Sequence, residues 1–341
     1  MAASPRKRLV DEPRLGAHMS VAGGLPLAVD RAVAHRCDAL QIFAKNANQW
    51  KGRVLPRDEI RTFRSRVDAS GIAPVVSHAS YLINLAARGR LLRRMSLDAM
   101  GDEIDRAEAL GLLGVVLHPG CYISSIRGPL PPGHASRGPG CPASPSETVG
   151  LKLIAEGLLE LLSARRRGRT MVLLEHTAGQ GTSLGSSFEQ IAAIVDMMNG
   201  HKRIGVCLDT CHLLASGYDI TTDAGYADTF ARFDRLIGFD RLKAFHVNDS
   251  KRPLGSRVDR HEHIGKGYLG LEPFRRIVND RRFGGLPMML ETPKTEGRRP
   301  TSIEVDPLDE RNLNALRALI GATTSPVRSR AAQRARGSRA T

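Results

Sequence analysis

A chain of 341 residues, 41% of them hydrophobic, is long enough to bury a sizeable core. No apolar run reaches membrane-spanning length and the charged N-terminus is unlike a signal peptide, so we expect an intracellular protein without membrane contact. The five cysteines include no CxxC pair, which favours a reducing compartment over a disulfide framework. A net charge of +15 fits either an ordinary solvated surface or a polyanionic partner such as nucleic acid.

The two ends of the chain differ in composition from its middle. Residues 1–13 and 322–341 are poor in large apolar residues and rich in Arg, Ser and Ala, so we predict disordered tails flanking one domain, residues 14–321. The C-terminal tail carries five arginines and no acid, which still leaves the domain itself basic. The basic run Pro5–Arg8 is only a weak candidate for a nuclear localisation signal. We therefore expect the protein to lie in a bacterial cytoplasm, associated with the nucleoid, with the nucleus as the alternative.

Short apolar runs alternate with helical patterns between these tails. Continuous apolar runs separated by helices are typical of buried parallel strands joined by crossover helices. Eight such runs over about 300 residues predict a (β/α)8 TIM barrel, with a doubly wound sheet as the alternative. In chain order, the predicted strands are Leu15–Met19, Ala39–Phe43, Pro74–His78, Gly114–His118, Met171–Glu175, Ile204–Asp209, Leu242–Val247 and Pro287–Glu291. The clearest helical patterns are Leu91–Leu110, Leu151–Ala164, Phe188–Met198 and Thr222–Ile237.

Two stretches interrupt this rhythm. Residues 123–146 are rich in Pro, Gly and Ser and show no periodicity, which predicts a long inserted loop after the fourth strand. Residues 250–269 lie between the seventh strand and the next helix and carry many ionisable groups. A long loop of that composition indicates function, because binding and catalytic residues are concentrated on loops held by a rigid scaffold.

Residues that can bind metals stand at the C-terminal ends of six successive strands, the third to the eighth. Barrel enzymes place their chemistry at this rim. One such residue could simply mark where a strand reaches water, but six in succession are hard to explain in that way. A second residue on the sixth unit and two in the 250–269 loop bring the candidates to nine. They are His78, His118, Glu175, Asp209, His212, His246, Asp259, His261 and Glu291.

These ligand types narrow the choice of metal. Five imidazoles and four carboxylates without an obvious thiolate favour zinc, with manganese or iron as alternatives. Nine ligands exceed one tetrahedral site, and bridging carboxylates could serve two or three ions. Clustered divalent ions suit phosphoryl chemistry, because they activate a water and neutralise charge on the phosphate and the leaving oxygen.

Five segments around these residues resemble the endonuclease IV family, the zinc-dependent apurinic/apyrimidinic endonucleases of base-excision repair. Together they form a highly specific pattern, and the resemblance covers roughly residues 14–320. The matching segments are residues 174–181 (LEHTAGQG), 205–212 (GVCLDTCH), 246–251 (HVNDSK), 259–267 (DRHEHIGKG) and 290–293 (LETP).

The resemblance implies a TIM barrel with three zinc ions and assigns all nine candidates to them. The first ion would be bound by His78, His118 and Glu175, the second by Glu175, Asp209, His246 and Glu291, and the third by His212, Asp259 and His261. The implied reaction is hydrolysis of the phosphodiester bond 5′ to an abasic site in duplex DNA, leaving a 3′-hydroxyl. The family also removes groups that block 3′ ends. Glu175, as the bridge, and Glu291, which would orient or deprotonate the attacking water, are the implied catalytic residues.

The resemblance also implies how the lesion is recognised. An abasic nucleotide has lost its stacking and pairing, so extruding it costs only about a few kcal/mol. Family members bend the DNA and insert side chains into the gap, and the matching positions are Tyr81 and Leu82. A third inserted residue, usually Arg in the family, is Asn48, so this chain lacks a cation at that point.

Three basic residues are candidates for contacts with the DNA backbone. Arg260 and Lys266 lie in the ligand-bearing loop, and Lys45 lies in the segment that contains Asn48. We expect the partner to be damaged double-stranded DNA, bound by a monomer.

Two other functions remain open at this point. A sugar isomerase-like barrel uses one or two metals on similar strand ends, but it would have no use for the Asp259–His261 pair or for His212. A non-catalytic DNA-binding protein on a decayed barrel should have lost a ligand, and none of the nine is missing.

Overall fold

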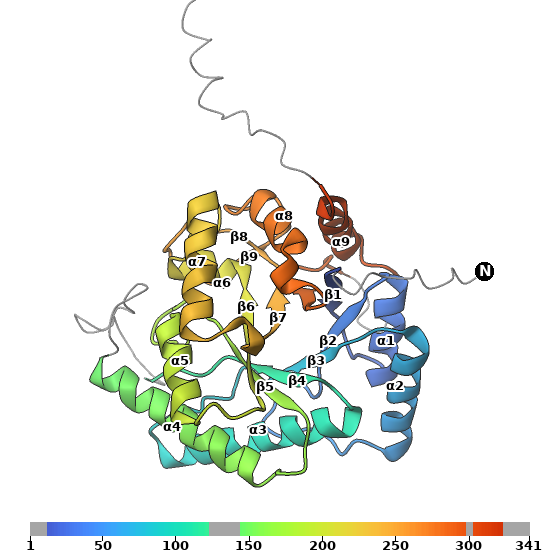
Figure 1. Cartoon of the computed structure of the whole chain (residues 1–341). Coiled ribbons are helices and arrows are strands. Elements are labelled where there is room, and N and C mark those ends of the chain that lie inside the picture. Colours follow the sequence, from blue (N-terminus) through green and yellow to red (C-terminus); the bar gives the residue numbers. More distant parts are fainter. Residues whose placement is uncertain (1–11, 123–143, 298–302, 323–341) are drawn as a thin grey trace, which may run out of the picture.

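The computed structural model describes residues 12–122, 144–297 and 303–322. Within them, eight parallel strands close into a barrel in the spatial order β1-β10-β7-β6-β5-β4-β3-β2, and helices surround the strands (Figure 1). This confirms the predicted TIM barrel and excludes the doubly wound sheet, which would stay open. The barrel strands are β1 (Arg14–His18), β2 (Ala39–Phe43), β3 (Val75–His78), β4 (Gly114–Leu117), β5 (Met171–Glu175), β6 (Ile204–Asp209), β7 (Leu242–His246) and β10 (Pro287–Leu290).

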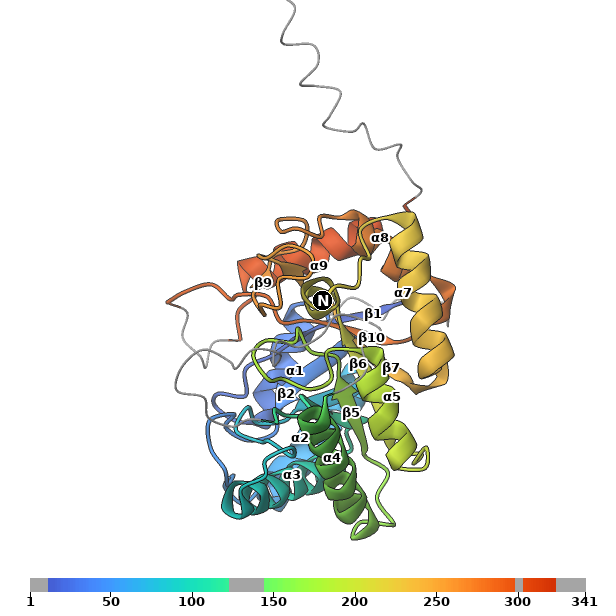
Figure 2. The same cartoon turned by 90° about the vertical axis from the view of Figure 1, so that its left-hand side faces the viewer.

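The helices pack along the outside of the barrel, and α5 and α7 lie side by side there in both views (Figures 1 and 2). A short antiparallel pair, β8 (Asp249–Ser250) and β9 (His261–Glu262), stands apart from the barrel sheet. The helices are α1 (Leu25–Ala34), α2 (Arg57–Ser70), α3 (Arg90–Leu110), α4 (Pro145–Ser163), α5 (Phe188–Met197), α6 (Thr210–Ser216), α7 (Asp223–Leu236), α8 (Glu272–Asn279) and α9 (Pro307–Leu319), with short 3-10 turns at Phe239–Arg241 and Arg281–Phe283.

The start of α4 differs from the sequence prediction, which placed it at Leu151. The helix begins at Pro145 because Ser144 and Glu147 form a capping box. The Ser144 hydroxyl accepts the Glu147 N–H, and the Glu147 carboxylate accepts the Ser144 N–H at 2.6 Å. The last residues of the predicted 123–146 loop therefore belong to the helix start. Residues 123–143, and nearly all of both predicted tails, lie outside the described residues.

Inside the barrel, an apolar cluster supports a polar rim. Seven strands each contribute one buried residue to this cluster: Ala39, Val76, Val116, Leu173, Cys207, Ala244 and Met289. Side chains two positions apart on a strand point to the same side. The next inward positions toward the C-terminal ends are therefore Gln41, His78, His118, Glu175, Asp209, His246 and Glu291. Six of these seven are predicted metal ligands, so strand alternation alone directs them to one place.

Two further sequence expectations can be compared with the described residues. None of the helices in those ranges has the length and apolar character needed to span a membrane. The four cysteines that lie within them, Cys37, Cys121, Cys207 and Cys211, are all free thiols.

The eighth strand, β1, contributes Gly16 below His18 in the same interior pattern, and Gly16 has no room for a side chain. A Cβ there would lie 2.1 Å from the carbonyl oxygen of Ala39 on β2. We expect Gly16→Ala to lower the free energy of unfolding by about 2–3 kcal/mol, because β1 and β2 must move apart. Urea unfolding followed by circular dichroism measures this change.

Gly89 is the matched control for that substitution. A Cβ at Gly89 would meet nothing within 4 Å, and its φ of −68° suits any residue. Gly89→Ala should therefore cost less than about 1 kcal/mol. Equal losses in the two variants would show that the Gly16 contact does not limit packing of the barrel.

Candidate metal centre

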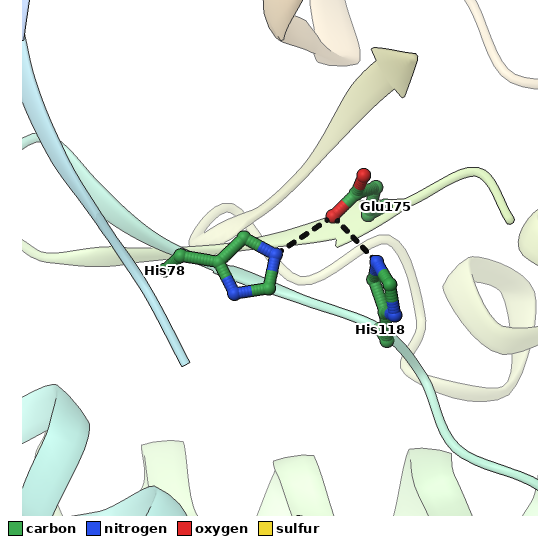
Figure 3. A group of neighbouring side chains, drawn as sticks. All are labelled: His78, His118 and Glu175. Atoms are coloured by element: carbon green, nitrogen blue, oxygen red, sulfur yellow. Dashed lines mark hydrogen bonds and ion pairs between the residues drawn. The ribbon is translucent and has the colours of Figure 1, made fainter. Parts of the chain in front are cut away.

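Three side chains at the ends of neighbouring strands form the first group of ligands. Oε2 of Glu175 lies 3.0 Å from Nε2 of His78 and 3.1 Å from Nε2 of His118 (Figure 3). Figure 3 shows both imidazoles turned toward this one carboxylate oxygen. His78 and Glu175 are buried, whereas the side chain of His118 is 37% exposed. The group is thus closed from below and open to solvent beside His118.

The second group uses the other oxygen of the same carboxylate. Oε1 of Glu175 lies 3.0 Å from Nδ1 of His246, which in turn lies 3.2 Å from Oε2 of Glu291 and 3.9 Å from Oδ2 of Asp209. These four residues offer one ligand atom each within 4.8 Å of one another. Because its two oxygens face different groups, Glu175 can bridge two ions.

The third group combines a helix end with the β8–β9 hairpin. His212 is on α6, and its Nε2 lies 3.1 Å from Oδ2 of Asp259. Nε2 of His261, on β9, lies 3.3 Å from Oδ1 of Asp259. Both Nε2 atoms are buried, and neither makes a hydrogen bond within the described chain. A cation bound to both nitrogens and to the carboxylate would supply the missing partner, so these residues fit a metal ion.

The hairpin that carries Asp259 and His261 is fixed by a buried aspartate. The carboxylate of Asp249 accepts the N–H groups of Gly267 and Leu269 at 2.9 Å each. A Cβ at Gly267 would lie 2.2 Å from the carbonyl oxygen of Ser250, so the loop closes tightly there. The position of His261 is thereby set by backbone contacts on both sides of it.

Carboxylates and imidazoles of the centre stabilise each other's charged forms at short range. Burial alone would raise the pKa of Glu175, but His118 and His246 hold that pKa well below its ordinary value. Burial alone would lower the pKa of His212, but Asp209 and Asp259 raise it well above the ordinary value. The carboxylates thus stabilise positive charge in this space, which is what a site for divalent cations requires.

Hydrogen bonds fix which ring nitrogen faces the centre in three of the ligand histidines. Nδ1 of His78 is 2.8 Å from the carbonyl oxygen of Ala79, and Nδ1 of His212 is 2.8 Å from that of His176. Each contact occupies Nδ1 and leaves Nε2 as the ligand atom. His246 is turned the other way, because its Nε2 is 2.8 Å from Oε1 of Gln41. Partners of this kind orient ligands and raise their basicity.

Two buried amides that are not among the predicted site residues support the ligands. Besides holding His246, Gln41 donates from Nε2 to Oε1 of Glu291 at 2.5 Å. Asn248 donates to Oδ2 of Asp209 at 2.7 Å and accepts the N–H of Glu291 at 2.8 Å. Gln41 was recognisable as the only amide in an apolar strand run, but the run alone does not show what it contacts.

The predicted DNA contacts lie around the same rim. Tyr81 is 63% exposed, and its ring centre is 5.5 Å from that of His78. Leu82 beside it is half-buried, and Asn48, Arg260 and Lys266 are exposed. The structure therefore brings the nine ligand candidates together and leaves four of these five residues open to solvent.

Comparison with known proteins decides the family. The family model described as "Xylose isomerase-like TIM barrel" matches residues 29–318. A protein from Chloroflexus aurantiacus named "Probable endonuclease 4" is 45% identical over 308 residues, which cover 90% of this chain and 98% of that protein. This chain belongs to the endonuclease IV family. The crystal structure of endonuclease IV from Thermus thermophilus is 35% identical, covers 90% of this chain and 98% of its own, and superposes with a TM-score of 0.73.

The barrel itself is shared beyond the endonuclease IV family. A crystal structure of D-psicose 3-epimerase in the presence of D-fructose superposes with a TM-score of 0.63 at 15% identity, covering 91% of this chain and all of its own. At that identity the likeness concerns the fold alone. The chemistry must therefore be argued from the residues at the rim.

Gln41 gives a test of how the centre is supported. We expect Gln41→Leu to weaken binding of divalent metal ions by about 10- to 100-fold, because His246 and Glu291 lose the group that orients them. Metal content and competition with a chromogenic chelator measure this. Gln190→Leu removes another buried amide, one that accepts the backbone N–H groups of residues 185 and 186, and should leave metal affinity unchanged. Unchanged affinity in the Gln41 variant would contradict the supporting role.

Proposed function

We propose that this chain is a DNA repair endonuclease of base-excision repair. It hydrolyses the phosphodiester bond 5′ to an abasic site in duplex DNA, leaves a 3′-hydroxyl and also removes 3′-blocking groups. Its centre holds three zinc ions, with manganese or iron as alternatives at one or more positions. It acts as a monomer in a bacterial cytoplasm, and its substrate is damaged double-stranded DNA.

The third ligand group is the observation that carries this proposal. His212, Asp259 and His261 lie within 4.8 Å of one another, next to the two groups that share Glu175. A sugar isomerase needs one or two metals, so that function would give the third ligand group no role. Three adjacent cations instead suit a phosphodiester, because the phosphate, the attacking water and the leaving oxygen all need positive charge.

The exposure of each side chain indicates whether it can only hold a metal or can also reach the substrate. Glu175 and His246 are wholly buried, so they can hold metals but cannot reach a substrate. The side chain of Glu291 is 15% exposed. It is therefore the carboxylate of the second group that can orient a water and take its proton at Oε2, while Gln41 occupies Oε1. Zinc ions bound here would supply the Lewis-acid charge that activates the water and neutralises the phosphate.

Substrate recognition rests on the exposed residues of the rim. Tyr81 presents a ring above the first ligand group, where it can fill the gap left by a missing base. Arg260 and Lys266 are exposed on the loop that carries Asp259 and His261, so they can contact the phosphates on either side of the lesion. The basic body, with a net charge of +15, favours DNA at long range.

A duplex with one abasic-site analogue tests the function directly. We expect the purified, zinc-loaded protein to cut the strand on the 5′ side of the analogue and to contain about three zinc ions per chain. Denaturing electrophoresis and elemental analysis provide the two measurements. An undamaged duplex of the same sequence is the control. An uncut substrate, together with isomerisation or epimerisation of a sugar by a protein with one or two metals, would refute the proposal.

Glu175→Ala tests the bridge between the first two groups. We expect incision to fall by about 10³-fold or more, because several kcal/mol of charge stabilisation depend on the two ions that it joins. Binding of abasic DNA should persist in part, because the exposed contacts remain. Single-turnover incision and fluorescence anisotropy measure the two effects. Glu147→Ala removes a buried glutamate outside the centre and should retain incision, whereas wild-type rates in Glu175→Ala would rule out the bridge.

A further inference from the structure

A buried ion pair lies beneath the loops that the proposed function assigns to lesion recognition. The side chains of Lys45 and Glu103 are each 1% exposed, and Nζ of Lys45 is 3.5 Å from Oε1 of Glu103. Lys45 follows β2, and Glu103 lies in the middle of α3. At this depth Lys45 cannot reach a DNA phosphate, so its prediction as a backbone contact is wrong.

Lys45 holds the first of these loops from below. Its Nζ donates to the carbonyl oxygen of Trp50 at 3.0 Å and to that of Ala99 on α3 at 3.3 Å. The loop between Lys45 and Trp50 contains the exposed Asn48. The ammonium group therefore ties both ends of this loop to one helix.

Glu103 holds the second loop. Its Oε1 accepts the N–H of Ser80 at 3.1 Å, directly before Tyr81 and Leu82. The Ser80 hydroxyl then donates to the carbonyl oxygen of Ala47 at 2.5 Å, so it joins the second loop to the first. The same hydroxyl accepts the N–H of Leu82 at 3.3 Å. One charge pair and one hydroxyl thus connect all three residues assigned to the lesion.

One face of α3 carries the residues that anchor this network. Ala99, Asp102, Glu103 and Arg106 follow helical spacing and share one face of α3. Arg106 donates to Asp102 at 2.9 Å and to the backbone carbonyl groups of Ala44 and Arg53, which flank the first loop. The face of α3 is therefore a polar platform under residues 44–53.

Stability alone does not explain such a pair. A buried ion pair is often no more stabilising than apolar residues of the same size, because two charges have lost their hydration. Here Oε2 of Glu103 makes no hydrogen bond within the described chain, so the pair is not fully satisfied. What the pair supplies is position, since each of its charges also holds backbone groups of a recognition loop.

We propose that Lys45, Glu103 and Ser80 are positioning residues that set the Asn48 and Tyr81 loops at one fixed separation for lesion recognition. This inference rests on the proposed function, because it assumes that both loops meet DNA. None of the three residues belongs to a candidate metal group. They act only through the loops that they hold.

The test replaces both charges at once. Lys45→Met/Glu103→Leu removes both charges of the pair, and Asp102, which lies 3.6 Å from Lys45, keeps Arg106 at 2.9 Å. The fold should therefore survive while the loops lose their anchor. We expect kcat/KM for the abasic duplex to fall by about 10- to 100-fold, because a misplacement of 1 Å has that effect. Zinc content and binding of an undamaged duplex should not change. A 2-aminopurine placed opposite the abasic analogue emits more strongly when it is unstacked. We expect the double variant to raise this emission less than the wild-type protein does.

Combination with Tyr81→Ala separates positioning from a general structural role. If the pair acts by placing Tyr81, the loss in the triple variant should be smaller than the product of the separate losses. Ser80→Ala, a milder change, should show the same pattern if the double variant folds poorly. Glu108→Gln is the control, because Glu108 lies on the same helix but holds the N–H groups of Arg169 and Thr170.

The outcomes are unambiguous. Losses that multiply independently, or wild-type kcat/KM in both the double variant and Ser80→Ala, would overturn the inference. A wild-type protein that leaves the abasic duplex uncut would instead refute the proposed function. The two failures are therefore distinguishable, because the first appears only in variants of an active enzyme.

Discussion

The whole centre depends on one carboxylate that has no access to water. Glu175 is 0% exposed, and a charged group in such a place is unfavourable unless cations and hydrogen-bond donors surround it. Imidazole nitrogens of His78, His118 and His246 stand within 3.1 Å of its two oxygens, and one of His212 is 3.4 Å away. These residues come from four different parts of the chain. The barrel must therefore close with the correct register before the charge of Glu175 is compensated, which couples the fold to the site.

The alternation of side chains along parallel strands explains why so much of this centre is readable in the sequence. A closed barrel turns every second residue inward, so an apolar interior residue is followed two positions later by a residue at the rim. Val76 precedes His78 in this way, and Leu173 precedes Glu175. The same alternation of inward-facing residues therefore predicts both the strands and the ligand candidates at their ends. The bounds of β2, β5 and β6 agree with the sequence prediction at both ends, and those of the other five barrel strands differ from it by one residue.

What the sequence did not reveal are partners whose roles depend on distant neighbours. Gln41 has the same interior position as the ligands, but its value lies in contacts with residues more than 200 positions away. Asn248 joins Asp209 to the backbone of Glu291 in the same long-range manner. Lys45 looked like a surface cation because its burial follows from the packing of α3, which no local pattern shows. The start of α4 at Pro145 was also missed, because the Pro, Gly and Ser content of residues 123–146 predicted a loop up to residue 146.

The third ligand group is positioned differently from the first two. The residues of the first two groups lie at the C-terminal ends of barrel strands or directly after them. The third takes Asp259 and His261 from a segment outside the barrel sheet, and Asp249 fixes that segment through backbone N–H groups rather than through the barrel core. The same segment also exposes Arg260 and Lys266, so in the proposed function the third metal site and the phosphate contacts lie on one loop. The third ligand group therefore depends on this segment together with His212 of α6, and not on the strand ends of the barrel alone.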